Sequence, residues 1–473
     1  MARWPVEVQL GKGRLMETIR ENPLWSDRRV LTAGIILYAL IHIPFIVIGF
    51  GEQDAWRNGF AALNLGKGLG YEPSRFPGYP VLELTYGALA RIFPSESLWI
   101  YTNSLTLILT LIGMVFYFNI VQFHKISRPL TTVSLLFFIP IIFVNASSSM
   151  DYLWTVTFIL IAYWSLLQKR PTTGGIFLGL AIGVRMTTGI FLFPFLIFLI
   201  GNPEIFPKKA AFRSALLFIF SALILSGICY LPLMVNYHFS FLTFLFPSRD
   251  FLRSGYYIMQ EIFGFPGWVF LILLMIIKRK GLIRWNWERS LWGMIIAFYL
   301  ALFLVKPEKV EYLIPMFPFL CLWLAQWLTG TFRYLWIGLI ILNNILSFGV
   351  VELTPKGISF NKMDKGVSWK TYQRYQKYRQ DADYLIYFPY PPDTKVKMGY
   401  RHPGVLFLLE LPAYQKRKIE LQNNQIIFPE NFDAEKKRNT YWVFGSLGYK
   451  EERQFLSSKK HVILYPPSTR TGP

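Results

Sequence analysis

Charged side chains are scarce in this chain of 473 residues. Asp, Glu, Lys and Arg together make up 16% of the sequence, whereas 53% of the residues are hydrophobic. A soluble globular domain carries about a quarter charged residues, so this scarcity excludes a water-soluble globular protein. Most of the surface must face lipid instead, and the composition predicts an α-helical polytopic membrane protein.

Cysteine and histidine are also rare. Cys229 and Cys321 both lie inside apolar runs, which argues against a disulfide framework or a thiolate metal site. None of the five histidines has the spacing of a helical metal site to another. No internal repeat is visible, which weakens transporter architectures built from repeated halves. The net charge of +21 is distributed over short segments between apolar runs, so we expect anionic lipid headgroups rather than nucleic acid as partners.

Long apolar runs, by contrast, recur along the chain. A bilayer core of about 30 Å requires about 20 apolar helical residues. The predicted spans are 31–50, 98–123, 131–147, 151–168, 174–200, 214–235, 263–278, 289–305, 312–328 and 334–351. Residues 174–200 are long for one span and short for two. Counting basic residues favours a hairpin that turns near Arg185, giving about eleven membrane helices; a single tilted helix is the alternative.

The basic residues also predict orientation and domains. Residues 1–30 are basic and polar, and we expect them in the cytoplasm, followed by a first span that is retained as an anchor. Residues 31–351 form a transmembrane domain with an exterior loop at 51–97. Residues 352–473 are charged and rich in Tyr, and they predict a small extracytoplasmic α/β domain. We expect the protein in a bacterial plasma (inner) membrane.

The exterior loop 51–97 concentrates charge, glycine, proline and aromatic residues. Glu52 and Asp54 directly follow the first span, where carboxylates are costly unless they are paired or functional. They suit a general base or a ligand of a divalent cation beside a phosphate. The guanidinium groups of Arg57 and Arg75 fit phosphate oxygens. Tyr79 lies in a Pro-Gly-Tyr-Pro run that fixes a rigid turn.

This arrangement resembles the GT-C superfamily of glycosyltransferases, and within it the protein O-mannosyltransferase and aminoarabinose-transferase branch. The residues that carry the resemblance are the Glu-x-Asp pair after the first span and Ser74-Arg75-Phe76-Pro77-Gly78-Tyr79-Pro80 in the same loop. Three further segments, 145–152, 179–185 and 306–315, resemble a second exterior loop with an acid, a short helix that ends in a basic residue, and a late charged loop. The resemblance covers roughly residues 31–330.

The resemblance implies that a sugar leaves a polyprenyl phosphate and joins a glycan, lipid or protein acceptor, with inversion, on the extracytoplasmic face. It implies a general base at Asp54, assistance or a shared metal at Glu52, and a second acid at Asp151. The residues implied in binding the donor and its lipid phosphate are Arg57, Arg75, Arg185, Lys306, Glu311 and Tyr79, with Lys309 as a weaker candidate.

The chain also departs from the branch. It has Glu-x-Asp where an Asp-Glu pair is common and Arg185 where Lys is common. These departures leave open the sugar and any need for a divalent cation, which Glu52 and Asp54 would hold; no other cofactor is implied.

Plainer interpretations exist for each residue. Asp54 could be an interfacial acid paired with Arg57, Asp151 could be a helix-terminal residue near capping serines, and Arg185 could snorkel from a helix end. Alternative functions are a transporter or flippase of lipid-linked sugars, a polymerase or ligase of surface polysaccharide, and a structural membrane subunit.

Overall fold

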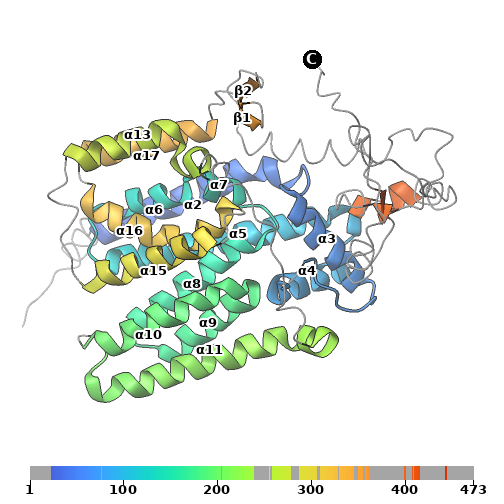
Figure 1. Ribbon diagram of the computed structural model, residues 1–473, viewed down its shortest axis with the longest axis horizontal. Coiled ribbons are helices and arrows are strands. Elements are labelled where there is room, and N and C mark those ends of the chain that lie inside the picture. Colours follow the sequence, from blue (N-terminus) through green and yellow to red (C-terminus); the bar gives the residue numbers. More distant parts are fainter. Residues whose placement is uncertain are drawn as a thin grey trace, which may run out of the picture.

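The computed structural model describes residues 23–75, 77–203, 205–238, 258–277, 287–305, 309–328 and 330–345, Gly255, and the tail residues 350–354, 357–361, 399–400, 407–408, 410–415 and 443–444. The described body consists of helices lying side by side (Figure 1). Lys306 and most of the α/β domain expected over 352–473 lie outside these residues.

The α-helices of the described body are α2 (Pro23–Ile46), α3 (Gln53–Gly66), α4 (Pro80–Ile92), α5 (Leu98–Phe123), α6 (Pro129–Phe137), α7 (Pro140–Asn145), α8 (Asp151–Leu167), α9 (Pro171–Val184), α10 (Leu192–Gly201), α11 (Lys208–Tyr237), α13 (Gly264–Ile277), α15 (Trp287–Val305), α16 (Phe317–Trp327) and α17 (Thr331–Ile345). Shorter helical segments are η1 (Ser95–Ser97), η2 (Met186–Phe191), η4 (Met259–Phe263), η5 (Val310–Met316) and η6 (Pro412–Tyr414). The strands pair antiparallel, β1 (Val350–Thr354) with β2 (Gly357–Asn361) and β3 (Gly399–Tyr400) with β4 (Val443–Phe444).

Five helical segments in the described part of the chain are long and apolar enough to cross a membrane. They are Asp27–Ile46, Ser95–Phe123, Ala210–Tyr237, Trp287–Val305 and Val310–Trp327. Four shorter apolar segments are Asp151–Leu167, Pro171–Val184, Met186–Gly201 and Pro266–Ile277. The protein is therefore an α-helical, multi-pass membrane protein.

The segment 51–97, expected as an exterior loop, is largely helical. It contains α3 and α4, which pack against each other (Figure 1). Apolar residues recur along α3 with helical spacing, and Ala55, Trp56, Ala62 and Leu63 are buried. Because α3 is too short and too polar to cross a bilayer, its sequence does not have the apolar length that predicts a membrane span. A tail residue, Phe407, packs edge-on against Trp56 with the ring centroids 5.5 Å apart.

The chain reverses direction near Arg185, as the hairpin interpretation requires. Gly175 on α9 contacts Phe218 of α11, and the Phe195 ring of α10 lies 6.2 Å from the same Phe218 ring. Residue 195 is thus back at the level of residue 175. Arg185 lies at the opposite end of this hairpin, beside the first residue of α8. A single straight helix over 174–200 does not fit these contacts.

Glycines allow α9 to approach α11 closely. Gly175, Gly179 and Gly183 recur every four residues, and a Cβ atom at each would fall 2.0, 2.8 and 2.8 Å from the nearest atom of α11. At Gly175 the neighbours include the backbone oxygen of Phe218, at 2.3 Å, which cannot rotate away. Small residues at such spacing are how membrane helices bring their backbones together. This contact sets the position of the end of α9 and hence of Arg185.

The substitution Gly175→Ala should destabilise the protein by about 1–3 kcal/mol, because the added methyl group forces α9 away from α11. Gly227→Ala is the matched control, since Gly227 lies on α11 with no atom within 4 Å of its would-be Cβ. Thermal unfolding in detergent should show a lower midpoint for Gly175→Ala only. Equal midpoints for both variants would contradict the close α9–α11 contact.

Candidate functional site

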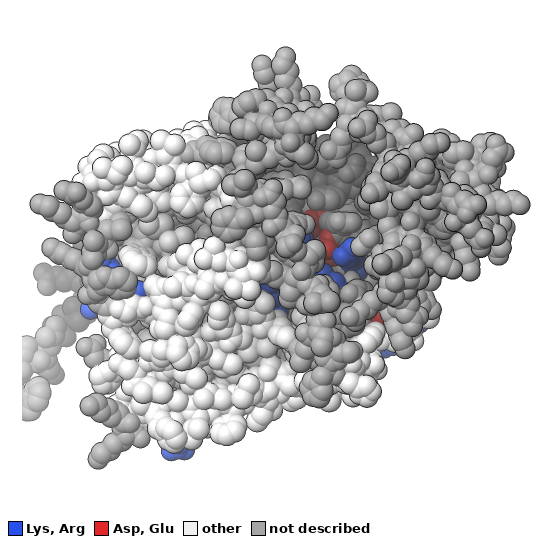
Figure 2. All heavy atoms as spheres, viewed as in Figure 1, with Lys and Arg blue, Asp and Glu red and all other residues white. Residues whose placement is uncertain are grey.

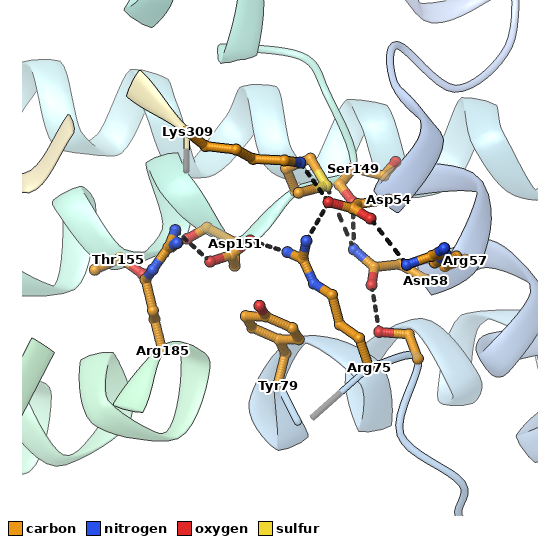
Figure 3. Close-up of polar contacts among 12 residues, drawn as sticks. Asp54, Arg57, Asn58, Arg75, Tyr79, Ser149, Asp151, Thr155, Arg185 and Lys309 are labelled. Carbon is orange, nitrogen blue, oxygen red and sulfur yellow. Dashed lines mark hydrogen bonds and ion pairs between the residues drawn. The ribbon is translucent and has the colours of Figure 1, made fainter. Parts of the chain in front are cut away.

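Charged side chains converge in one place in the structure (Figure 3). They come from segments far apart in the sequence: the start of α3, the 71–79 segment before α4, the start of α8, the residue after α9, and the residues at the start of η5. In the space-filling view, red and blue spheres meet beside the apolar, white body (Figure 2). Most of these residues are candidates in the sequence, where we expect the acids and the basic side chains to meet, and the structure brings them into contact.

Arg75 lies at the centre of this group. Its Nη1 atom donates to Oδ2 of Asp54, and its Nη2 atom donates to Oδ1 of Asp151 at 3.3 Å. The guanidinium carbon lies 4.5 Å from the centre of the Tyr79 ring, a cation–π distance. Arg75 therefore joins the acid of α3 to the acid of α8 while Tyr79 covers its face.

Asp54 is surrounded by cations. Besides Arg75, its carboxylate is paired with the Nζ atom of Lys309 and, at 3.5 Å, with the Nη1 atom of Arg57. Burial alone would raise the pKa of the Asp54 carboxyl, but the charges of Arg75, Lys309 and Arg57 outweigh burial and hold this pKa well below its usual range. The stabilisation from these pairs is present above the ordinary pKa of about 4 and is lost only as the pH falls through the lowered value.

Asp151 is buried and makes two pairs. Its Oδ2 atom accepts a hydrogen bond from Nη1 of Arg185 at 2.8 Å, in addition to the contact with Arg75. The Arg185 guanidinium carbon lies 4.9 Å from the Tyr152 ring centre and 4.6 Å from that of Tyr312. Asp151 is the first residue of α8, as the plainer interpretation expects, but Met150 precedes it and no side chain caps this helix end. Its carboxylate is held by the two arginines.

Glu52 and Glu311 are both buried near the same group, with relative exposures of 3% and 7%. Burial alone would lower the pKa of the Lys309 ammonium, yet the negative charges of Glu52, Asp54 and Glu311 raise it. Lys309 therefore stays charged. Lys306, the other basic candidate from that segment, lies outside the described residues.

The group is balanced in charge. Its acids are Glu52, Asp54, Asp151 and Glu311, and its bases are Arg57, Arg75, Arg185 and Lys309. No group of three or more metal-ligating side chains occurs in the part of the chain that was described. The contacts of Asp54 with three cationic side chains make it a poor ligand for a further cation. The residues present therefore do not fit the divalent-cation site that Glu52 and Asp54 would form if the reaction needed one.

A second network, which sequence reasoning missed, holds the segment that carries Arg75. Glu83 of α4 accepts hydrogen bonds from the Tyr71 hydroxyl at 2.5 Å and from the Ser74 amide at 2.7 Å. Ser74 in turn contacts Asn58 of α3. In the sequence, the only indication of this network is an acid inside the otherwise apolar turn Val81–Leu84. The hydrogen-bond partners of that acid come from tertiary contacts, so residue spacing does not predict them.

Comparison with known proteins adds no further constraint. No protein-family model, no curated protein and no solved structure matches the chain.

Asp151→Asn should destabilise the protein by about 3–5 kcal/mol, because it leaves the buried guanidinium group of Arg185 and the largely covered one of Arg75 without their shared counter-charge. Arg57→Gln should change stability little, since the Arg57 side chain is 32% exposed and its pair is weakly held. Thermal unfolding of both variants checks this. A stable Asp151→Asn protein would show that the chain of ion pairs does not hold the site together.

Proposed function

We propose that this protein is a membrane glycosyltransferase that moves a sugar from a polyprenyl phosphate to an acceptor hydroxyl. The observation that carries the proposal is the alternating series Arg57, Asp54, Arg75, Asp151 and Arg185, gathered at one end of an apolar helical body. Such a site can bind an anionic group at the membrane surface and also contains carboxylates that can accept a proton.

The phosphate of the donor would compete with the acids for their cations. Its oxygens are strong acceptors, and the fork of Arg75 and the ammonium of Lys309 are suited to them. When the phosphate takes these two cations, Asp54 loses the charges that hold its pKa down. Its basicity then rises towards that of an ordinary carboxylate, which makes it a better proton acceptor.

The chemical step follows from these roles. The acceptor oxygen attacks the anomeric carbon of the sugar from the side opposite the phosphate, and its proton passes to Asp54. The bond from that carbon to the phosphate oxygen breaks, and the polyprenyl phosphate leaves with the electron pair. Arg75, Arg185 and Lys309 stabilise the negative charge that develops on the phosphate. Attack from the opposite side inverts the configuration of the sugar.

We further propose the topology that the reaction requires. About eleven membrane helices would place residues 1–30 in the cytoplasm of a bacterium and the Asp54 end at the outer face of its plasma membrane. The basic residues Lys125, Lys169 and Arg213 support this orientation, because they belong to the opposite end of the described body. Residues 352–473 would form a small α/β domain beside the site, facing a glycan, lipid or protein acceptor.

The distribution of buried charge favours an enzyme over a transporter or flippase. In the described ranges the buried acidic and guanidinium side chains are Glu52, Asp54, Glu83, Asp151, Arg185, Glu311 and Arg333. All except Arg333 belong to the site end, and Arg333 donates to the Ser127 carbonyl in the turn after α5 at the other end. A transport path would be lined by polar or charged groups near the middle of the helices.

A transfer assay on the purified protein in lipid, with a panel of polyprenyl-phosphate sugars, tests the proposal. We expect the wild-type chain to transfer at least one sugar and Asp54→Asn to lose at least about a hundredfold in rate, a typical effect of removing a general base.

Glu96→Gln is the matched control, because Glu96 is an exposed acid outside the site; it should keep full activity. Thermal unfolding must show that Asp54→Asn is folded. Full activity of a folded Asp54→Asn variant would remove Asp54 from the reaction.

A further inference from the structure

Glu83 is a buried acid, and the hydrogen atoms that its hydrogen bonds require can be counted. It has a relative exposure of 1%. Its Oε2 atom accepts from the Tyr71 hydroxyl at 2.5 Å and from the Tyr79 amide at 3.1 Å. Its Oε1 atom accepts from the Ser74 amide at 2.7 Å and lies 2.6 Å from the Ser74 hydroxyl oxygen. Each of these contacts needs one proton.

The Ser74 hydroxyl has two acceptors within reach and only one proton to give. Besides Oε1 of Glu83, its oxygen lies 2.8 Å from Oδ1 of Asn58. If Glu83 were ionised, either the contact with Asn58 or the contact with Glu83 would join two oxygens with no proton between them. If Oε1 of Glu83 carries a proton, it donates a hydrogen bond to the Ser74 hydroxyl oxygen. The Ser74 hydroxyl can then donate its own hydrogen to Oδ1 of Asn58. Every contact then has its hydrogen.

The orientation of Asn58 leaves no other solution. Its Nδ2 atom donates to the backbone oxygen of Ser149 at 3.0 Å. Reversing the amide would place the Asn58 oxygen against that carbonyl oxygen, which is repulsive. The oxygen of the Asn58 amide must therefore face Ser74. Asn58 is fully buried, so no solvent hydroxyl replaces the missing donor.

The surroundings of Glu83 also disfavour a negative charge. No ion pair to Glu83 is found within the part of the chain that the structure describes. The titratable groups that face it are tyrosines: Tyr71 beside it and Tyr230 and Tyr237 on α11. Burial raises the pKa of the Glu83 carboxyl, and the hydrogen bonds from Ser74, Tyr71 and Tyr79 oppose this only in part.

We infer that Glu83 is a neutral carboxylic acid in the folded protein near neutral pH, and that in this form it positions the segment that presents Arg75. The hydrogen bonds fix the backbone at Ser74 and at Tyr79, on both sides of Arg75. The proton relayed through Ser74 ties the same segment to α3 at Asn58. A neutral Glu83 also adds no charge to the balanced site. This role does not depend on the reaction proposed above.

Infrared spectroscopy tests the protonation state directly. The wild-type protein at neutral pH should show the carbonyl stretching band of a protonated carboxylic acid, and Glu83→Gln should remove it. Glu96→Gln, which replaces an exposed acid, should leave the band unchanged. A wild-type spectrum with no band that depends on Glu83 would overturn the inference.

The pH dependence of unfolding gives an independent test with a definite sign. A carboxyl that is neutral in the folded protein has a higher pKa there than in the unfolded chain, so the unfolded chain binds fewer protons. Its contribution is complete at low pH and is lost as the pH rises through the folded value. From about pH 5 to about pH 9, the unfolding midpoint of wild type should therefore fall more than that of Glu83→Gln. A wild-type midpoint that rises relative to Glu83→Gln would show that Glu83 is ionised.

The positioning role is tested by coupling between residues. Glu83→Ala and Arg75→Ala should each lower the unfolding midpoint. The double variant should show a smaller shift than the sum of the two single shifts, because both residues act through the same segment. Glu83→Ala with Lys67→Ala is the control pair, since Lys67 pairs with Glu410 in a different place. Additive shifts for Glu83 and Arg75 would mean that Glu83 does not position Arg75.

Discussion

The contact of one guanidinium group with two buried acids organises this protein. Arg75 lies between Asp54 of α3 and Asp151 of α8, and Asp151 also holds Arg185 at the end of α9. A charge removed from water at this depth is costly unless it is paired, so each pair requires the others. Two further features help to form these pairs. The close α9–α11 contact positions Arg185, and the network around Glu83 positions Arg75. The apolar body can vary in its lipid-facing side chains, whereas breaking one of these pairs lowers the stability of the folded protein.

The same charged groups are also those that the proposed reaction would use. Acids and bases balance in the free protein, so the site is stable without a ligand. An arriving phosphate would shift that balance, take cations from Asp54 and make this carboxylate more basic. In this proposal, base strength follows donor binding, so Asp54 becomes a good proton acceptor only when a donor is bound. Lys309 contributes to both states, because it pairs with Asp54 and lies in the field of Glu52 and Glu311.

Sequence patterns predicted the parts of this structure that depend on local properties. The span predicted at 98–123 has the same limits as α5, and the turn at Arg185 followed from the positions of basic residues. Asp54 and Arg75 were recognised by type and setting, and Asp151 and Arg185 through the resemblance to a glycosyltransferase superfamily. What spacing could not give is that Arg75 touches both acids. The helices α3 and α4 were missed because neither has the apolar length of a span. Glu83 was missed because an acid in an apolar turn becomes meaningful only when Tyr71, Ser74 and Tyr79 surround it.

The central claim is that these paired charges form a site for a lipid phosphate. The most direct measurement is native mass spectrometry of the purified protein with undecaprenyl phosphate and, separately, with undecaprenol, which has the same chain but no phosphate. The account predicts selective binding of the phosphate lipid and a loss of at least about tenfold in its affinity in Arg75→Ala, the size expected for one charge-assisted contact. Equal binding of the two lipids, or full affinity in a folded Arg75→Ala protein, would contradict it.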